Sequence, residues 1–232
     1  TGEPFRFVTN LGHHLRQRFG NLIPLVFYAN RFLVWRGIST GSIIKHFKIA
    51  QIRNTDPKTK HLFIAIADIR RNPGEVINKL REFKPDIIES MPSVLMELGR
   101  FAESLPSLRH PHFLYAVCHG ELLTAEQRNY IQDMFGCEVY NRYGLQEMQD
   151  IAIECARHNG FHVFEESFIV EVLDAAGNPL PPGVRGRIVV THFHNDAMPF
   201  IRYDTGDLGL IMTGICSCGI PSKRIFVEGR SG

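Results

Sequence analysis

Between residues 62 and 140, short apolar runs alternate with stretches whose apolar residues recur at helical spacing. Leu62–Ala67 is a continuous apolar run, which predicts a buried strand. Asn72–Glu75 then opens a helix whose apolar residues would share one face: Val76, Ile77, Leu80 and Phe83. Pro85 ends this helix, because a proline disfavours helical backbone at the residue before it.

The same alternation continues to Tyr140. Strands are predicted at Asp86–Ser90, His112–Val117 and Val139–Tyr140, with helices at Ser93–Leu105 and Thr124–Phe135. Thr124 and Gln127 have the spacing of a capping box, and Gly136 supplies a C-terminal stop. Repeated strand–helix units predict a parallel sheet covered by helices, with ligands at the carboxyl ends of its strands. Two such ends, His119–Glu121 and Asn141–Glu147, are expected to converge on one crevice.

The N-terminal part of the chain is less regular. A strand is expected at Phe5–Val8 and a helix at Leu11–Arg18, with strand, loop and some helix between residues 22 and 60. The aromatic residues of this part are assigned to the core rather than to a ligand cage: Phe27, Tyr28, Phe32 and Trp35.

After Gly160 the helical signals end. Phe161–Phe164, Phe168–Leu173 and Arg187–Thr191 predict strands, separated by turns rich in glycine and proline. We therefore predict an α/β fold: a parallel sheet flanked by helices in residues 1–155, which hold a nucleotide crevice, followed by an antiparallel, barrel-like subdomain in residues 156–232.

Composition limits the kinds of partner. A formal net charge of +2, from 26 basic and 24 acidic residues, does not favour nucleic acid or an anionic membrane. No run of ~18 apolar residues is present, so no membrane insertion is expected. The five cysteines do not have the spacing of a disulfide framework, which favours reduced thiols and a cytoplasmic location. The sequence does not decide the oligomeric state, and a homodimer is compatible with it.

The stretch Val139–Glu147 carries the densest candidate chemistry. We expect the chain to turn at Gly144, placing an amide, an aromatic ring and a carboxylate within a few residues. The ring of Tyr143 can stack on a heterocycle, Asn141 can read its edge, and Glu147 can hold Mg²⁺ beside phosphates. The alternative is a strand end followed by a solvated loop.

Arg202–Asp207 forms a second candidate. The carboxylate of Asp207, beside Gly206, is suited to accept hydrogen bonds from a pair of ribose hydroxyls. The alternative is a plain hairpin turn.

A third candidate is a set of thiols and imidazoles. Cys216 and Cys218 can chelate one ion, and Cys155 with either His158 or His162 would complete a tetrahedral zinc site. The alternative is three free thiols in a reducing compartment. The remaining cysteines, Cys118 and Cys137, are assigned to buried, apolar environments.

Four segments, in order along the chain, resemble the adenylate-forming superfamily, and within it the phenylacetate–CoA ligase branch with its capsular-polysaccharide-biosynthesis-type relatives. They are Thr1–Pro4 (the end of a phosphate loop), Gly120–Leu122, Tyr143–Glu147 (similar to Y-G-x-T-E) and Arg202–Asp207 (similar to R-Y-x-T-G-D). The Cys155, Cys216 and Cys218 set is similar to a zinc site of this branch.

The resemblance implies a reaction and a role for each matched residue. A carboxylic acid would attack the α-phosphate of ATP, releasing pyrophosphate, and the acyl-adenylate would then form a thioester with coenzyme A. Glu147 and Gln146 would form the catalytic set with Mg²⁺. Nucleotide contacts are implied for Gly120, Glu121, Asn141, Tyr143, Gly144 and Asp207. Arg224 and Arg230, near the end of the chain, are candidate phosphate contacts.

Two residues depart from the family pattern. Gln146 replaces a threonine and Glu3 replaces a lysine, which weakens phosphate contacts. The chain also looks like a fragment without the C-terminal lid domain, so weak turnover at best is expected of it alone. An acyl pocket is expected near Phe27–Trp35, Cys118–His119 and Met148, and the identity of the acid stays open. The alternatives are a non-catalytic, zinc-stabilised nucleotide-binding module and an adenylating enzyme with an acceptor other than coenzyme A.

Overall fold

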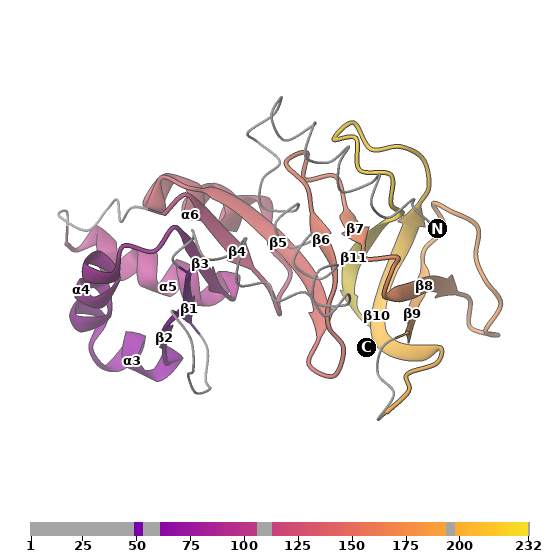
Figure 1. Ribbon diagram of the computed structural model, residues 1–232, viewed down its shortest axis with the longest axis horizontal. Helices are drawn as coiled ribbons and strands as arrows, with labels where there is room; N and C mark the ends of the chain where they lie inside the picture. Colours follow the sequence, from indigo (N-terminus) through magenta and orange to yellow (C-terminus); the bar gives the residue numbers. More distant parts are fainter. Residues whose placement is uncertain (1–48, 53–60, 106–112, 194–197, 232) are drawn as a thin grey trace. The chain divides into compact units, whose positions relative to one another are not determined.

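The computed structural model describes residues 49–52, 61–105, 113–193 and 198–231. They fall into two compact units, one within residues 45–142 and one within residues 143–232 (Figure 1). The elements expected before residue 48 lie outside the described residues, and the predicted subdomain limits at residues 155 and 156 stay a prediction. Among the described helices, none has the length and the apolar character needed to cross a bilayer.

The unit within residues 45–142 is a parallel sheet with helices. Its strands have the order β2-β1-β3-β4-β5, and every neighbouring pair is parallel. The elements are β1 (Ile49–Ile52), β2 (His61–Ile64), α3 (Ile66–Arg71), α4 (Pro73–Phe83), β3 (Ile87–Ser90), α5 (Pro92–Glu103), β4 (Tyr115–Cys118), α6 (Ala125–Phe135) and β5 (Glu138–Leu145), the last of which runs on into the second unit. The predicted alternation of strands and helices is confirmed.

Local signals explain where two of these helices begin and end. The side chain of Asn72 accepts a hydrogen bond from the backbone N–H of Glu75 at the start of α4, and Thr124 and Gln127 form the complete capping box of α6. Gly136 ends α6 at a positive φ of 58°. Because these bonds satisfy backbone groups that would otherwise be orphaned, the helix limits follow from the local sequence.

The run Leu62–Ala67 was expected to be one strand, and that prediction is wrong in its second half. Strand β2 ends at Ile64, and helix α3 begins at Ile66. A continuous apolar run does not distinguish a strand from a buried helix start. Here Ile69, one helical turn after Ile66, is fully buried in the core of the unit, which stabilises the helical alternative.

The unit within residues 143–232 is an antiparallel sheet with the order β6-β7-β11-β10-β9-β8. Its strands are β6 (Gln149–Glu154), β7 (Phe161–Val163), β8 (Phe168–Leu173), β9 (Gly186–His192), β10 (Tyr203–Met212) and β11 (Arg224–Arg230). The predicted antiparallel subdomain is confirmed. Strands β6, β10 and β11 were not predicted. Most of Arg202–Asp207, for which a plain hairpin turn was the alternative, lies in strand β10.

Gly144 does not form the turn expected of it. It lies inside β5, and the turn follows at Leu145–Met148, where the N–H of Met148 donates to the carbonyl of Leu145 at 3.2 Å. A Cβ atom on Gly144 would lie 2.2 Å from the carbonyl oxygen of Gln149. Glycine is therefore needed here because the backbone that returns from the turn passes too close for any side chain.

Replacing Gly144 tests this explanation. We expect Gly144→Ala to lower the free energy of unfolding by about 1–3 kcal/mol, the usual cost of overpacking. Gly74→Ala is the matched control, because its added Cβ meets only one atom, at 3.9 Å, and alanine favours helices. Urea denaturation followed by circular dichroism compares the two variants, and a Gly144→Ala protein as stable as wild type would contradict the explanation.

Candidate functional site

Tyr143 and Asp207 lie side by side although 64 residues separate them. The phenol of Tyr143 donates a hydrogen bond to Oδ2 of Asp207 at 2.7 Å. Both side chains are buried, with exposed fractions of 9% and 6%. Burial raises the pKa of Tyr143, so its hydroxyl stays protonated and remains a donor. The structure thus brings together the two residues assigned to the base and the ribose.

The Asp207 carboxylate is held by further contacts within the same unit. Nε of Arg230, on the neighbouring strand β11, lies 3.1 Å from Oδ1 of Asp207. The N–H of Asp207 donates to Oγ1 of Thr205, whose hydroxyl donates to the carbonyl of Ile188. A charged donor, a phenol and a fixed backbone therefore define where this carboxylate points.

Gln146 and Glu147 occupy the tip of the turn between β5 and β6, and both are exposed. A hydrogen bond from the hydroxyl of Tyr203 lowers the pKa of Glu147, so the carboxyl is ionised at neutral pH. An exposed, ionised carboxylate is a suitable ligand for a hard cation such as Mg²⁺. Met148, expected near an acyl pocket, is instead buried in the core of its unit.

The predicted base-pocket residues Gly120, Glu121 and Asn141 lie in the other unit. Gly120 has a positive φ of 78°, as a glycine turn requires. The Glu121 carboxylate accepts hydrogen bonds from the N–H of Ser93 at 3.1 Å and from its hydroxyl at 2.8 Å. Ser93 is in the first turn of α5, so Glu121 caps that helix. Local sequence gave no sign of this bond, because it joins residues 28 positions apart.

Arg224 was predicted to contact phosphate, but it lies far from Asp207 along strand β11. It pairs with Met212, whereas Arg230 pairs with Asp207. Six residues of strand correspond to about 20 Å. Arg224 is buried, and it donates to the carbonyl of Asn159 at 3.2 Å. Arg230 is therefore the basic residue that accompanies Asp207.

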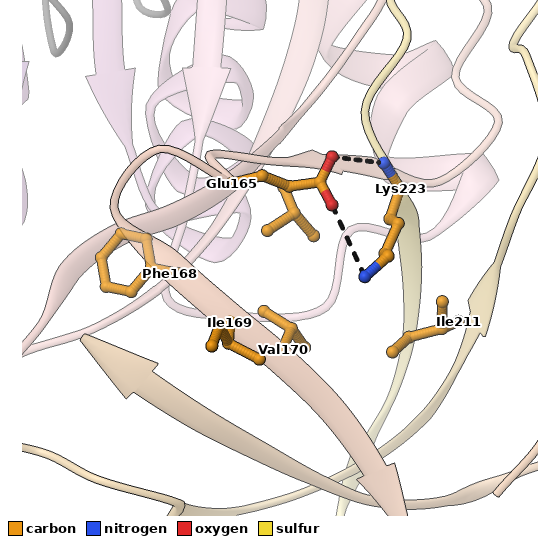
Figure 2. Close-up of a pocket in the computed structure, with 7 residues that line it drawn as sticks. Glu165, Phe168, Ile169, Val170, Ile211 and Lys223 are labelled. Atoms are coloured by element: carbon orange, nitrogen blue, oxygen red, sulfur yellow. Dashed lines mark hydrogen bonds and ion pairs between the residues drawn. The ribbon is translucent and has the colours of Figure 1, made fainter. Parts of the chain in front are cut away.

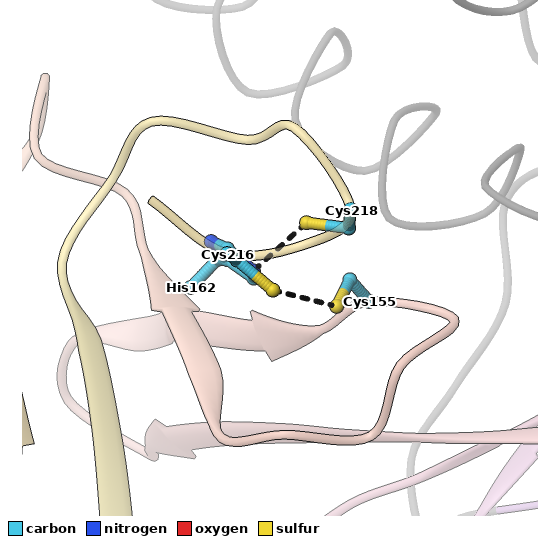
Figure 3. A group of neighbouring side chains, drawn as sticks. All are labelled: Cys155, His162, Cys216 and Cys218. Atoms are coloured by element: carbon cyan, nitrogen blue, oxygen red, sulfur yellow. Dashed lines mark hydrogen bonds between the residues drawn. The ribbon is translucent and has the colours of Figure 1, made fainter. Parts of the chain in front are cut away.

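Cys155, His162, Cys216 and Cys218 converge in the same unit (Figure 3). Their candidate ligand atoms all lie within 4.8 Å of one another. The sulfurs of Cys155 and Cys216 are 3.8 Å apart, and the sulfur of Cys218 lies 3.4 Å from Nε2 of His162. The cluster joins the end of β6 and the start of β7 to the loop before β11.

The structure decides between the two histidines proposed for this cluster. His162 is fully buried among the thiols, whereas Nδ1 of His158 lies 3.2 Å from the Glu154 carboxylate. Hydrogen bonds stabilise negative charge on the sulfurs: the N–H of Arg157 donates to Cys155 and that of Ile220 donates to Cys218, both at 3.4 Å. The remaining two cysteines behave as expected, since Cys118 and Cys137 are buried, and burial raises the pKa of Cys137 to about 12.

A small cavity lies elsewhere in this unit (Figure 2). Its volume is about 90 Å³, and it lies among Phe168, Val170 and Ile211, with Glu165 and Lys223 at its edge. The ion pair between Lys223 Nζ and Glu165 spans 3.7 Å, so each charge offsets the other. Ligand pockets usually enclose about 300–1,000 Å³, so this cavity is too small for a nucleotide.

Comparison with known proteins finds related sequences among phenylacetate–CoA ligases. The chain is 34% identical over 151 residues to the "Phenylacetate-coenzyme A ligase" of Thermus thermophilus, which covers 63% of this chain and 34% of that protein. It is 31% identical over 146 residues to the enzyme of the same name from Escherichia coli K12, which covers 58% of this chain and 32% of that protein. The chain thus spans about a third of the length of these curated relatives. No protein-family model matches it.

Solved structures show the same fold. A 2-hydroxyisobutyryl-CoA ligase in the postadenylation state, in complex with R3-HIB-AMP, superposes with a TM-score of 0.72 at 20% identity, covering 88% of this chain and 47% of that one. The amide bond synthetase McbA from Marinactinospora thermotolerans gives a TM-score of 0.56 at 15% identity, covering 79% and 41%. The predicted resemblance to adenylate-forming enzymes, and to phenylacetate–CoA ligases among them, is confirmed.

Removing the phenol tests the Tyr143–Asp207 contact. We expect Tyr143→Phe to lower the free energy of unfolding by about 1–3 kcal/mol, because a buried carboxylate loses a hydrogen-bond donor. Tyr203→Phe is the control, since it removes a hydroxyl that serves the exposed Glu147, and its effect should be small. Chemical denaturation of both variants makes the comparison, and equal stabilities would show that the contact contributes nothing.

Proposed function

We propose that this chain, a relative of the phenylacetate–CoA ligases, supplies the nucleotide-binding part of an ATP-dependent acyl- or aryl-CoA ligase. The reaction would join a small carboxylic acid to AMP with release of pyrophosphate, and then transfer the acyl group to the thiol of coenzyme A. The single observation that carries the proposal is the contact between Tyr143 and Asp207. It joins two of the matched segments, Tyr143–Glu147 and Arg202–Asp207, which the resemblance assigns to one nucleoside.

The Tyr143–Asp207 contact suits a nucleoside site. The Tyr143 ring offers an aromatic face to adenine, and the Asp207 carboxylate offers oxygens to the two ribose hydroxyls. Arg230 holds one of those oxygens already, which fixes the carboxylate before the ligand arrives. Such preorganisation reduces the ordering cost of binding.

The turn between β5 and β6 would bind the phosphates. The ionised Glu147 would hold Mg²⁺, which would neutralise charge on the phosphates during attack by the acid. The amide of Gln146 can donate one hydrogen bond to a phosphate oxygen, in place of the hydroxyl that the family pattern has there. The predicted roles of Gly120, Glu121, Asn141 and Gly144 remain part of the proposal, and Arg230 takes the place of Arg224 as the basic residue beside the nucleoside.

A non-catalytic nucleotide-binding module is the second candidate function. Two departures from the family pattern favour it: Gln146 stands where the pattern has threonine, and Glu3 stands where it has lysine. A third reading keeps the adenylation and replaces coenzyme A with another acceptor. All three share the nucleoside site, so a binding measurement tests what they have in common.

We also propose that the Cys155, His162, Cys216 and Cys218 cluster holds a structural Zn²⁺ ion. A tetrahedral ion with Zn–S bonds of ~2.3 Å would separate two sulfurs by about 3.8 Å, and a sulfur from an imidazole nitrogen by about 3.6 Å. The corresponding separations of 3.8 Å and 3.4 Å fit this geometry. Four protein ligands leave no open position, so the ion would crosslink two parts of the sheet rather than take part in the reaction.

Nucleotide binding provides the first test. Isothermal titration of the purified chain with AMP should show saturable binding, and Asp207→Asn should weaken it by about tenfold or more, because a charged acceptor becomes neutral. Asp174→Asn is the matched control, because Asp174 lies in the turn after β8, outside the matched segments, where its carboxylate accepts a hydrogen bond from the N–H of Asn178.

Two results would contradict the nucleoside assignment. One is a wild-type chain that takes up no AMP at millimolar concentration. The other is an Asp207→Asn chain that binds AMP as tightly as wild type. Weak turnover at best is expected of this chain alone. A pyrophosphate-exchange assay of the full-length protein, with a panel of aryl and aliphatic acids, therefore separates the enzyme from the non-catalytic module.

Metal analysis tests the zinc proposal. Purified protein should contain one equivalent of zinc, and Cys218→Ser should reduce the content to well below half an equivalent after dialysis. His158→Ala is the control and should keep the metal, because His158 contacts Glu154 and lies outside the cluster. Zinc-free wild-type protein whose five thiols all react with a thiol reagent after denaturation would refute the site.

A further inference from the structure

Ser222 contacts His162, the histidine of the proposed zinc cluster. It does so at the ring nitrogen that faces away from the thiols. Its hydroxyl lies 3.0 Å from Nδ1 of His162, while Nε2 of the same ring lies 3.4 Å from the sulfur of Cys218. Both residues are buried, with exposed fractions of 4% for Ser222 and 0% for His162. The ring therefore meets a hydroxyl at one nitrogen and the thiols at the other.

This arrangement links the hydroxyl to the tautomer of the ring. A metal ion needs the lone pair of Nε2, so the ring proton must then reside on Nδ1. A buried N–H needs an acceptor, because its desolvation is otherwise unfavourable. The Ser222 hydroxyl is an acceptor at hydrogen-bond distance, and as a rotor it can accept as readily as it can donate.

Backbone geometry holds the two residues in place. Ser222 lies two residues before β11, and at the start of that strand Arg224 pairs with His162 of β7. The pairing aligns the chain that carries Ser222 with the strand that carries the histidine. The N–H of Val163 also donates to the carbonyl of Lys223 at 3.0 Å, so the sheet constrains the residue next to Ser222.

We propose that Ser222 is a positioning residue for the metal centre: its hydroxyl oxygen accepts a hydrogen bond from the Nδ1–H of His162, which keeps the proton on Nδ1 and leaves the Nε2 lone pair for the ion. The inference rests on the zinc site proposed above. Partners of this kind usually change metal affinity by 10- to 100-fold when they are removed. They orient the ligand and raise its basicity without touching the ion.

Metal affinity of the whole chain measures the contribution of Ser222. Zn²⁺ and Co²⁺ are titrated against a competing chelator, with cobalt binding followed by its absorption bands. Ser222→Ala should weaken both metals by about tenfold or more. Ser222→Thr, which keeps the hydroxyl, should restore most of the affinity, and Ser217→Ala should bind as wild type, because Ser217 is exposed in the same loop.

A second measurement works on the wild-type protein and does not depend on a variant that folds. With ¹⁵N-labelled histidine and zinc bound, His162 should show a protonated, slowly exchanging Nδ1 and a metal-bound Nε2. Faster exchange at Nδ1 is expected in Ser222→Ala. A wild-type Nδ1 without a proton would overturn the assignment, as would a Ser222→Ala affinity equal to that of wild type.

The failure of this inference can be told apart from the failure of the zinc site. If wild-type protein binds neither Zn²⁺ nor Co²⁺ stoichiometrically, the site itself is wrong and the role of Ser222 falls with it. If wild type binds both metals and Ser222→Ala binds them equally well, the site stands and only the role of Ser222 is refuted.

Discussion

The hydrogen bond between the Tyr143 phenol and the Asp207 carboxylate is the constraint on which the functional account depends. It joins the end of β5 to β10 inside one compact unit, and its two partners come from segments that the sequence assigns to the two halves of a nucleoside. The bond is strong because a neutral donor meets a charge at low exposure, where water competes weakly. Arg230 then balances that charge. A carboxylate held in this way can bind a diol with little rearrangement.

The cluster of Cys155, His162, Cys216 and Cys218 lies toward the other end of the β10–β11 ladder. Cys155 directly follows the last residue of β6, His162 lies on β7, and Cys216 and Cys218 lie in the loop before β11. At this end of the β10–β11 ladder Met212 pairs with Arg224, and at the opposite end Asp207 pairs with Arg230. Strand β11 is thus tied at one end by the cluster and at the other by the Asp207 ion pair. We infer that a zinc ion would stabilise the sheet that positions Asp207 while remaining distant from the chemistry.

Much of the fold could be predicted from the sequence because its signals are local. The caps of α4 and α6 depend on residues three apart, and the alternation of apolar runs and helices specifies a parallel sheet. Strand β10 was harder to predict, because Gly206 and Gly209 interrupt its pattern and the pairing with β9 shifts register after Asp204. Gly144 was assigned to a turn, because the local sequence does not reveal how close the Gln149 carbonyl lies to its backbone. Bonds such as Glu121 to Ser93 and Ser222 to His162 have no local signal, since 28 and 60 residues separate the partners. The matched segments predicted Tyr143 and Asp207 as neighbours, and only the structure showed that His162, rather than His158, lies among the thiols.

A crystal structure with bound AMP measures the central claim most directly. The account predicts adenine against the ring of Tyr143 and the ribose hydroxyls within hydrogen-bond distance of the Asp207 carboxylate. AMP bound elsewhere, with the Tyr143–Asp207 pair unchanged and out of contact with it, would contradict the account.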